Sequence, residues 1–133
     1  MTKLKILIAD DSSVILSRLK NTMEENPKVN LIGEANNAGE ISNFLKFVMP
    51  DVISLDIMMP GKSGIEVLME IKKDYPSVKV IMLTNQSESY YRKLCMSLGA
   101  DYFFDKSTEF TKVPVALNQI YDQCFNENNT PAA

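Results

Sequence analysis

Short apolar runs and segments of helical periodicity alternate along this chain, and this alternation most constrains what it can fold into. The runs are rich in β-branched residues, and they predict strands over residues 4–9, 29–35, 52–56, 78–83 and 102–104. Strands that alternate with helices build a parallel sheet that is covered on both faces. The sequence therefore predicts an α/β fold, a doubly wound parallel sheet made of five βα units.

Apolar stripes at helical spacing fill the segments between and after these strands. Asn37 with Glu40, and Ser63 with Glu66, have the spacing of a capping box and predict where the second and third helices begin. Pro50 is expected to close the second helix. The stripes comprise Ile15, Leu16, Leu19 and Met23; Ile41, Phe44, Leu45 and Val48; Ile65, Leu68, Met69 and Ile71; Tyr91, Leu94, Cys95 and Leu98; and Leu117, Ile120, Tyr121 and Cys124.

Length and apolar content predict one domain. The 133 residues are 45% apolar, enough for one buried core and too few for two ordinary ones. We expect this domain to span residues 1–125 and a flexible C-terminal tail to span residues 126–133, which are polar and lack an apolar pattern. No stretch is long enough for a membrane span, and the N-terminus lacks a secretory pattern, so we expect a cytoplasmic protein.

Charge and side-chain chemistry exclude several classes of function. The chain has 17 Asp and Glu residues against 14 Lys and Arg residues, and it has no run of basic residues of the kind that binds the phosphate backbone of nucleic acids. Direct binding of nucleic acid is therefore not expected. Cys95 and Cys124 fall in helical stripes and are predicted to be buried, reduced thiols. Histidine is absent, so any phosphoryl group must come to this chain from outside.

Polar residues stand where the predicted strands end. Asp10 and Asp11 follow the first strand, Asp56 ends the third, Thr84 follows the fourth and Lys106 comes soon after the fifth. With the flavodoxin-like strand order 2-1-3-4-5, ligands bind where strand order reverses, between strands one and three. Three carboxylates that meet there repel one another unless a cation lies among them. The pattern indicates a site for a divalent metal ion.

These residues, in this order, resemble the receiver domain of two-component response regulators, of the single-domain type found in chemotaxis regulators. The similarity runs from about residue 3 to residue 125. Each polar position lies at the carboxyl end of a predicted strand, which makes a coincidence improbable. The positions that carry the resemblance are Asp10, Asp11, Asp56 with Met58-Met59-Pro60-Gly61 after it, Thr84 and Lys106.

The resemblance implies that Asp56 is the phosphoacceptor, whose carboxylate attacks phosphorus to form an aspartyl phosphate. It also implies a Mg²⁺ site made by Asp11, Asp56 and the backbone carbonyl of Met58, with Asp10 orienting a metal-bound water. Oxygen ligands of this kind suit Mg²⁺, which keeps several waters. Such a domain catalyses its own phosphorylation and dephosphorylation and is not an enzyme for other substrates.

The remaining positions are expected to hold and report the phosphoryl group. Lys106 would pair with a phosphoryl oxygen, and the Thr84 hydroxyl and Asn85 backbone N–H would donate hydrogen bonds to others. In receiver domains an aromatic residue at the position of Phe103 changes rotamer as the equivalent of Thr84 moves. We therefore expect Thr84 and Phe103 to form a switch, read at the surface made by helix four, strand five and helix five.

Departures from the family pattern carry their own expectations. Ser107 stands where many receiver domains have proline, which puts the geometry of that loop and the reach of Lys106 in question. Met58 and Gln86 occupy the positions that tune hydrolysis of the phosphoryl group in the family. Because an apolar Met58 cannot position an attacking water, we expect slow autodephosphorylation.

Partners and alternatives follow from this interpretation. A histidine kinase or histidine phosphotransfer protein would supply the phosphoryl group, and a protein target would read it, with the chain a monomer or a phosphorylation-dependent dimer. One alternative is a metal-dependent phosphatase with an aspartyl nucleophile, which instead spaces its two acids two apart. The other is a flavodoxin-like binding module, although the acidic loop after the first strand disfavours a cofactor phosphate.

Overall fold

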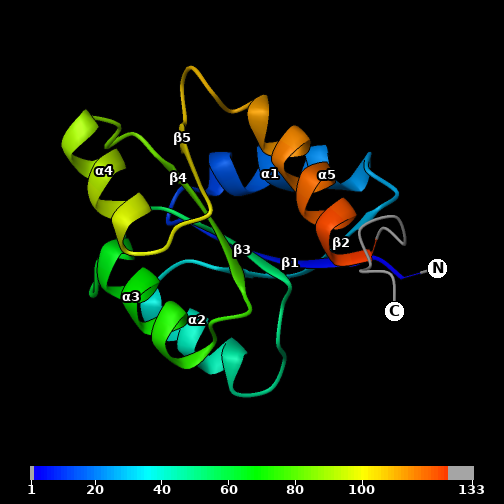
Figure 1. Ribbon diagram of the computed structural model, residues 1–133, viewed down its shortest axis with the longest axis horizontal. Helices are drawn as coiled ribbons and strands as arrows, with labels where there is room; N and C mark the ends of the chain where they lie inside the picture. The colour runs from blue at the N-terminus through cyan, green and yellow to red at the C-terminus, as the bar shows by residue number, and fades with distance from the viewer. Residues whose placement is uncertain (1, 126–133) are drawn as a thin grey trace, which may run out of the picture.

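The computed structural model describes residues 2–125 as one parallel sheet flanked by helices (Figure 1). Within this part of the chain, no helix is long and apolar enough to cross a bilayer. Its elements in chain order are β1 (Leu4–Ala9), α1 (Ser13–Glu24), β2 (Val29–Ala35), α2 (Ala38–Leu45), β3 (Val52–Leu55), α3 (Gly64–Asp74), β4 (Lys79–Thr84), α4 (Ser89–Ser97), β5 (Tyr102–Asp105) and α5 (Lys112–Phe125). The predicted tail over residues 126–133 lies outside the described residues.

The strand order is β2-β1-β3-β4-β5, and every neighbouring pair is parallel, which confirms the predicted fold class. Helices α2, α3 and α4 pack on one face of the sheet, and α1 and α5 pack on the other (Figure 1). The chain thus buries an apolar core on each face, as a doubly wound sheet requires. β1 and β3 lie side by side at the point where strand order reverses.

Side-chain caps begin three of the helices, and two of these caps confirm the sequence prediction. The Asn37 side chain accepts a hydrogen bond from the Glu40 backbone N–H, and Ser63 accepts one from Glu66. Ser12 caps α1. Each cap satisfies a backbone donor that has no partner within its own helix.

The second helix ends earlier than predicted. It stops at Leu45, whereas the stripe through Val48 and the position of Pro50 predicted a longer helix. The amides of Lys46 and Phe47 donate to carbonyls three residues back, so the chain tightens into a turn after Leu45. This turn carries Val48 off the helical stripe, and its side chain is 40% exposed.

One of the two cysteines was predicted wrongly. Both are free thiols, and Cys95 is buried as expected, but Cys124 is exposed. Tyr121 and Phe125 take the partly buried positions in the last turn of α5 and leave Cys124 facing solvent. Gly99, just after α4, has a φ of 104°, which confirms that it ends this helix in the left-handed conformation.

Strand register brings the predicted site residues to one edge of the sheet. Ala9 pairs with Leu55, so the next residues along β1 and β3 are Asp10 and Asp56. Thr84 at the end of β4 pairs with Asp105 on β5, directly before Lys106. The carboxyl ends of four strands therefore present their polar side chains together.

The start of α3 packs tightly against the backbone beneath Asp56. A Cβ atom on Gly64 would lie 1.9 Å from the Asp56 carbonyl oxygen and 2.8 Å from the Ile57 Cα. These are backbone atoms, so the loop that carries Asp56 would have to shift to make room. Only glycine fits at this position.

We predict that Gly64→Ala lowers the free energy of unfolding by about 2 kcal/mol, because overpacking against backbone is costly. Gly39→Ala is the control: Gly39 is an exposed position in α2, where alanine favours the helix. Urea denaturation of both variants measures the difference. Equal stability of Gly64→Ala and the native chain would contradict the packing described for α3.

Candidate functional site

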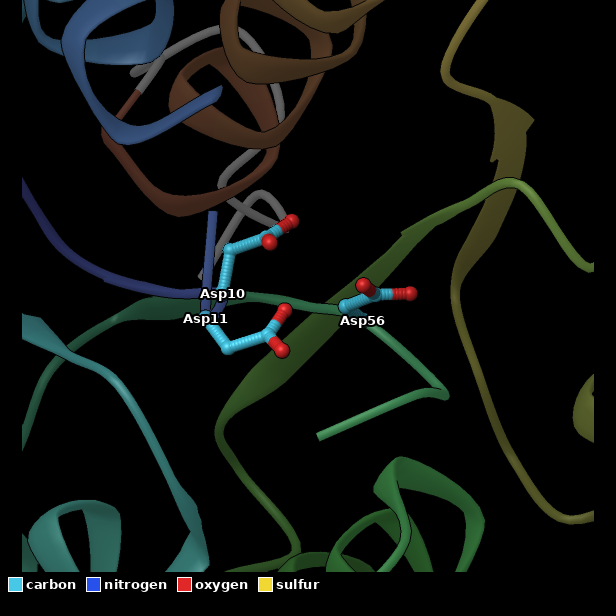
Figure 2. A group of neighbouring side chains, drawn as sticks. All are labelled: Asp10, Asp11 and Asp56. Atoms are coloured by element: carbon cyan, nitrogen blue, oxygen red, sulfur yellow. The ribbon is translucent and has the colours of Figure 1, made fainter. Parts of the chain in front are cut away.

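Three carboxylates gather at the switch point between β1 and β3. Carboxylate oxygens of Asp10, Asp11 and Asp56 all lie within 4.8 Å of one another. Figure 2 shows these side chains rising from the adjoining ends of the two strands. Asp10 and Asp56 are buried, with 2% and 4% exposure, whereas Asp11 is exposed. The structure thus brings together the three acids that were predicted from the sequence to meet at this edge of the sheet.

Lys106 lies between the two buried acids. Its Nζ is 2.7 Å from Asp10 Oδ2 and 2.7 Å from Asp56 Oδ2, and the residue is only 7% exposed. A lysine that reaches across from the loop after β5 therefore neutralises part of the charge that β1 and β3 bring together. Three carboxylates against one ammonium leave the cluster net negative.

The buried charges shift two pKa values upward. Burial disfavours the carboxylate of Asp10 and raises its pKa, and its hydrogen bond with Lys106 offsets only part of this rise. Burial acts in the opposite direction on Lys106, but its hydrogen bonds to Asp10 and Asp56 outweigh burial and raise the pKa of the ammonium. Lys106 is therefore charged at neutral pH.

Local hydrogen bonds orient the acidic pair after β1. Asp10 Oδ1 accepts a hydrogen bond from the Ser12 backbone N–H at 2.9 Å, and the Ser12 hydroxyl caps α1 through the Ile15 N–H. Because Ser12 is the cap, Asp11 is not needed to start the helix. Its carboxylate is exposed and points toward Asp56 (Figure 2).

Thr84 is fully buried at the end of β4, on the same edge of the sheet. Its Oγ1 accepts a hydrogen bond from the Gln86 backbone N–H at 3.1 Å, which leaves the hydroxyl proton to be donated elsewhere. Met58 is 60% exposed, and its N–H lies 3.4 Å from Asp56 Oδ1. Met58 and Gln86 are the residues predicted to tune hydrolysis of the phosphoryl group. Met58 lies two positions after Asp56, and Gln86 lies two positions after Thr84.

Phe103 is buried, with 3% exposure, and an arginine from α4 holds it there. The Arg92 guanidinium lies 4.9 Å from the centre of the Phe103 ring, and its Nη1 donates to the Phe103 carbonyl at 2.8 Å. A cation over an aromatic face is attractive. Phe103, which was predicted to be part of the switch, is therefore buried in the protein. Its change of rotamer remains a prediction.

The loop after β5 contains residues that the sequence reasoning missed. Lys106 reaches the acids although Ser107 replaces the proline common in the family, and the described residues include no cis peptide bond. The Asp105 carboxylate accepts hydrogen bonds from two backbone N–H groups of this loop, and the Glu109 carboxylate accepts one from the Asp105 N–H at the end of β5. The sequence signal that could have identified these two acids is their spacing, because Asp105 and Glu109 stand four residues apart on either side of Lys106.

The structure thus has a cluster of three acids at the switch point of a 2-1-3-4-5 sheet, with a buried lysine beside it. Residues 6–118 match the model of the response regulator receiver domain, and the chain belongs to this family. It is therefore a domain of two-component signalling proteins. This membership sets aside the phosphatase and the flavodoxin-like binding module.

Individual relatives agree with this assignment. The chain is 36% identical over 121 residues to protein-glutamate methylesterase/protein-glutamine glutaminase 1 of Carboxydothermus hydrogenoformans, covering 90% of this chain and 35% of that protein. A Clostridium acetobutylicum methylesterase is 33% identical, with 98% of this chain and 41% of that protein covered. Protein CcdB of Bacillus subtilis is 31% identical, with 87% and 96% covered. The chain thus spans well under half of each methylesterase.

Solved structures agree as well. The isolated receiver domain of RcsB from Salmonella enterica serovar Typhimurium, in the presence of the phosphomimetic BeF3-, has a TM-score of 0.81 and 26% identity. The match covers 89% of this chain and 90% of that one. The receiver domain of the putative response regulator NarL from Mycobacterium tuberculosis, at 22% identity and a TM-score of 0.83 over 92% of this chain and 98% of that one, shares the fold.

We predict that Lys106→Met destabilises the metal-free domain by about 3 kcal/mol at neutral pH, because it leaves buried carboxylates without their cation. Urea denaturation in EDTA measures this loss, and adding Asp10→Asn to the same chain should recover part of it. Lys62→Met, which breaks an exposed pair with Glu70, is the control and should change little. A Lys106→Met variant as stable as the control would contradict the role of the buried ion pairs.

Proposed function

We propose that this domain accepts a phosphoryl group on Asp56 from the phosphohistidine of a histidine kinase or a histidine phosphotransfer protein. The reaction requires Mg²⁺, and the phosphorylated domain changes its binding to a protein partner. The observation that carries the proposal is Asp56 itself, a buried carboxylate that shares Lys106 with Asp10 at the switch point of a receiver fold. We assign this role to residues 1–125 and place the domain in the cytoplasm, as a monomer or as a dimer that forms on phosphorylation.

The two oxygens of Asp56 are not equivalent. Oδ2 is paired with Lys106 at 2.7 Å, whereas the one hydrogen bond of Oδ1 within residues 2–125 is the long 3.4 Å contact from the Met58 N–H. We assign the attack to Oδ1. A bond forms from this oxygen to phosphorus while the P–N bond to the donor imidazole breaks, and the imidazole leaves with the bonding electrons and takes a proton from solvent.

The donor set fits Mg²⁺. The cluster offers carboxylate oxygens from three residues and no nitrogen or sulfur ligand, and it carries a net negative charge. Asp11, Asp56 and the Met58 carbonyl would hold the ion, with Asp10 bonded to a coordinated water. When bound, Mg²⁺ neutralises the charge that would otherwise repel the phosphoryl group.

Groups on β4 and the loop after β5 would hold the transferred phosphoryl oxygens. The Lys106 ammonium is already at the site, and the Thr84 hydroxyl can donate its proton while it accepts the Gln86 N–H. The Asn85 N–H supplies a further donor. When Thr84 moves toward the phosphoryl group, the inward Phe103 ring follows, and the surface of α4, β5 and α5 changes with it.

Incubation with acetyl phosphate and Mg²⁺, followed by intact-mass analysis, tests this function. We predict one phosphoryl group per chain, absent in EDTA and absent in Asp56→Asn. The matched control is Asp74→Asn, which changes an exposed acid on α3 and should be phosphorylated normally. Equal phosphorylation of Asp56→Asn and the control would show that the acceptor is another residue.

The phosphorylated form should lose its phosphoryl group slowly, because the exposed, apolar Met58 side chain cannot orient an attacking water. We predict that Met58→Asn, which adds a side chain able to bind water, speeds hydrolysis about tenfold, equal to a barrier about 1.4 kcal/mol lower. The decay of the phosphorylated mass after removal of acetyl phosphate measures both rates. Decay of the native form within seconds would rule out the slow hydrolysis.

A further inference from the structure

The turn that carries Lys106 is closed by two carboxylates. Asp105 Oδ1 accepts hydrogen bonds from the backbone N–H groups of Ser107 at 2.7 Å and Thr108 at 2.9 Å. Glu109 Oε1 accepts the Asp105 N–H at 3.1 Å, and the Glu109 N–H donates to the Asp105 carbonyl at 2.9 Å. Both ends of the turn are thus fixed, with Lys106 between them.

Neighbouring elements hold both carboxylates in place. A hydrogen bond from the Ser87 hydroxyl, in the loop after β4, and the amide bonds from the turn lower the pKa of Asp105 to about 2. The Asp105 amide, then Arg92 and Lys112, lower the pKa of Glu109 to about 2. Arg92 reaches Glu109 from α4 with an Nη2 to Oε1 distance of 2.7 Å. Both acids are therefore ionised acceptors at neutral pH.

Lys106 is bonded at both its ammonium and its backbone N–H. Its ammonium makes two contacts of 2.7 Å inside the protein, and its backbone N–H donates to the Thr84 carbonyl at 3.0 Å. A lysine side chain has many rotamers, so a fixed backbone is needed to keep its ammonium at one place. A proline at position 107 would fix the φ angle of that residue through its ring, which Ser107 cannot do. Unlike proline, Ser107 has a backbone N–H, which donates to Asp105.

We propose that Asp105 is a positioning residue that holds the ammonium of Lys106 at Asp56, with Glu109 bracing the same turn from its other end. This role rests on the proposed function, in which Lys106 binds the phosphoryl group accepted by Asp56. Through Asp105 and Glu109, the Ser87 and Arg92 contacts also connect the turn that carries Lys106 to the β4–α4 loop and to α4.

The test compares Asp105→Ala with Asp105→Asn. Both turn amides bond to the same oxygen, Oδ1, so asparagine keeps both acceptor contacts while alanine removes them. Asp74→Ala, at an exposed position on α3, is the control for loss of an acidic side chain. Urea denaturation first establishes that each variant is folded under the assay conditions.

Two measurements report the position of Lys106 independently. The first is the rate at which acetic anhydride modifies Lys106 in the metal-free protein, followed by peptide mass spectrometry; this rate requires no phosphorylation. The second is the initial rate of phosphorylation as a function of acetyl phosphate concentration in Mg²⁺. We expect Asp105→Ala to raise the modification rate several-fold and to lower the maximal phosphorylation rate about tenfold or more. Asp105→Asn should stay close to the native chain in both.

The proposal is overturned if folded Asp105→Ala matches Asp74→Ala in both measurements, or if Asp105→Asn is as impaired as Asp105→Ala. If Asp105→Ala does not fold, Glu109→Ala and Glu109→Gln replace the pair, because glutamine keeps an acceptor for the Asp105 N–H. If the native chain takes no phosphoryl group, the proposed function fails, and the modification rates still decide whether Asp105 positions Lys106.

Discussion

The structure depends on one buried arrangement of charge, the Lys106 ammonium held between the carboxylates of Asp10 and Asp56. Two buried carboxylates close together repel each other and are poorly solvated, so they need a cation within contact distance. The sequence supplies the acids at the ends of β1 and β3 and the cation after β5, at the far edge of the sheet. The parallel register and the turn after β5 together bring these three charges into contact. Loss of Lys106 leaves two buried carboxylates without a cation, whereas loss of one acid leaves the other still paired with Lys106.

The same arrangement explains why the proposed function needs few groups. One ammonium against three carboxylates leaves the cluster net negative. The cluster therefore suits a divalent cation, and it suits a phosphoryl group only when that cation is bound. In the proposed reaction Lys106 exchanges part of its contact with the carboxylates for a phosphoryl oxygen. Its backbone N–H is bonded to the Thr84 carbonyl, and its turn is braced by Arg92 through Glu109. Arg92 also donates to the Phe103 carbonyl, so hydrogen bonds connect the Lys106 turn to α4 and to the backbone at Phe103.

Much of this could be predicted from sequence, because apolar periodicity and strand ends are local signals. The strands and the polar residues at their ends follow from such signals. Their order, and with it the meeting of Asp10, Asp11, Asp56 and Lys106 at one edge, rested on the flavodoxin-like fold assumed for five βα units. The end of α2 at Leu45 and the exposure of Cys124 did not follow, because tertiary packing decides where a helix leaves its sheet. The Asp105 and Glu109 contacts were also missed, since side-chain capping inside a loop has no periodicity.

The most direct test of the central claim is to locate the phosphoryl group chemically. Borohydride reduces an aspartyl phosphate to homoserine, and peptide mass spectrometry then identifies the residue that was modified. After phosphorylation by a phosphohistidine donor in Mg²⁺, homoserine should appear at position 56 and at no other aspartate. Homoserine at position 10 or 11, or a phosphoryl group that survives reduction on a serine or threonine, would contradict the assignment of Asp56 as the acceptor.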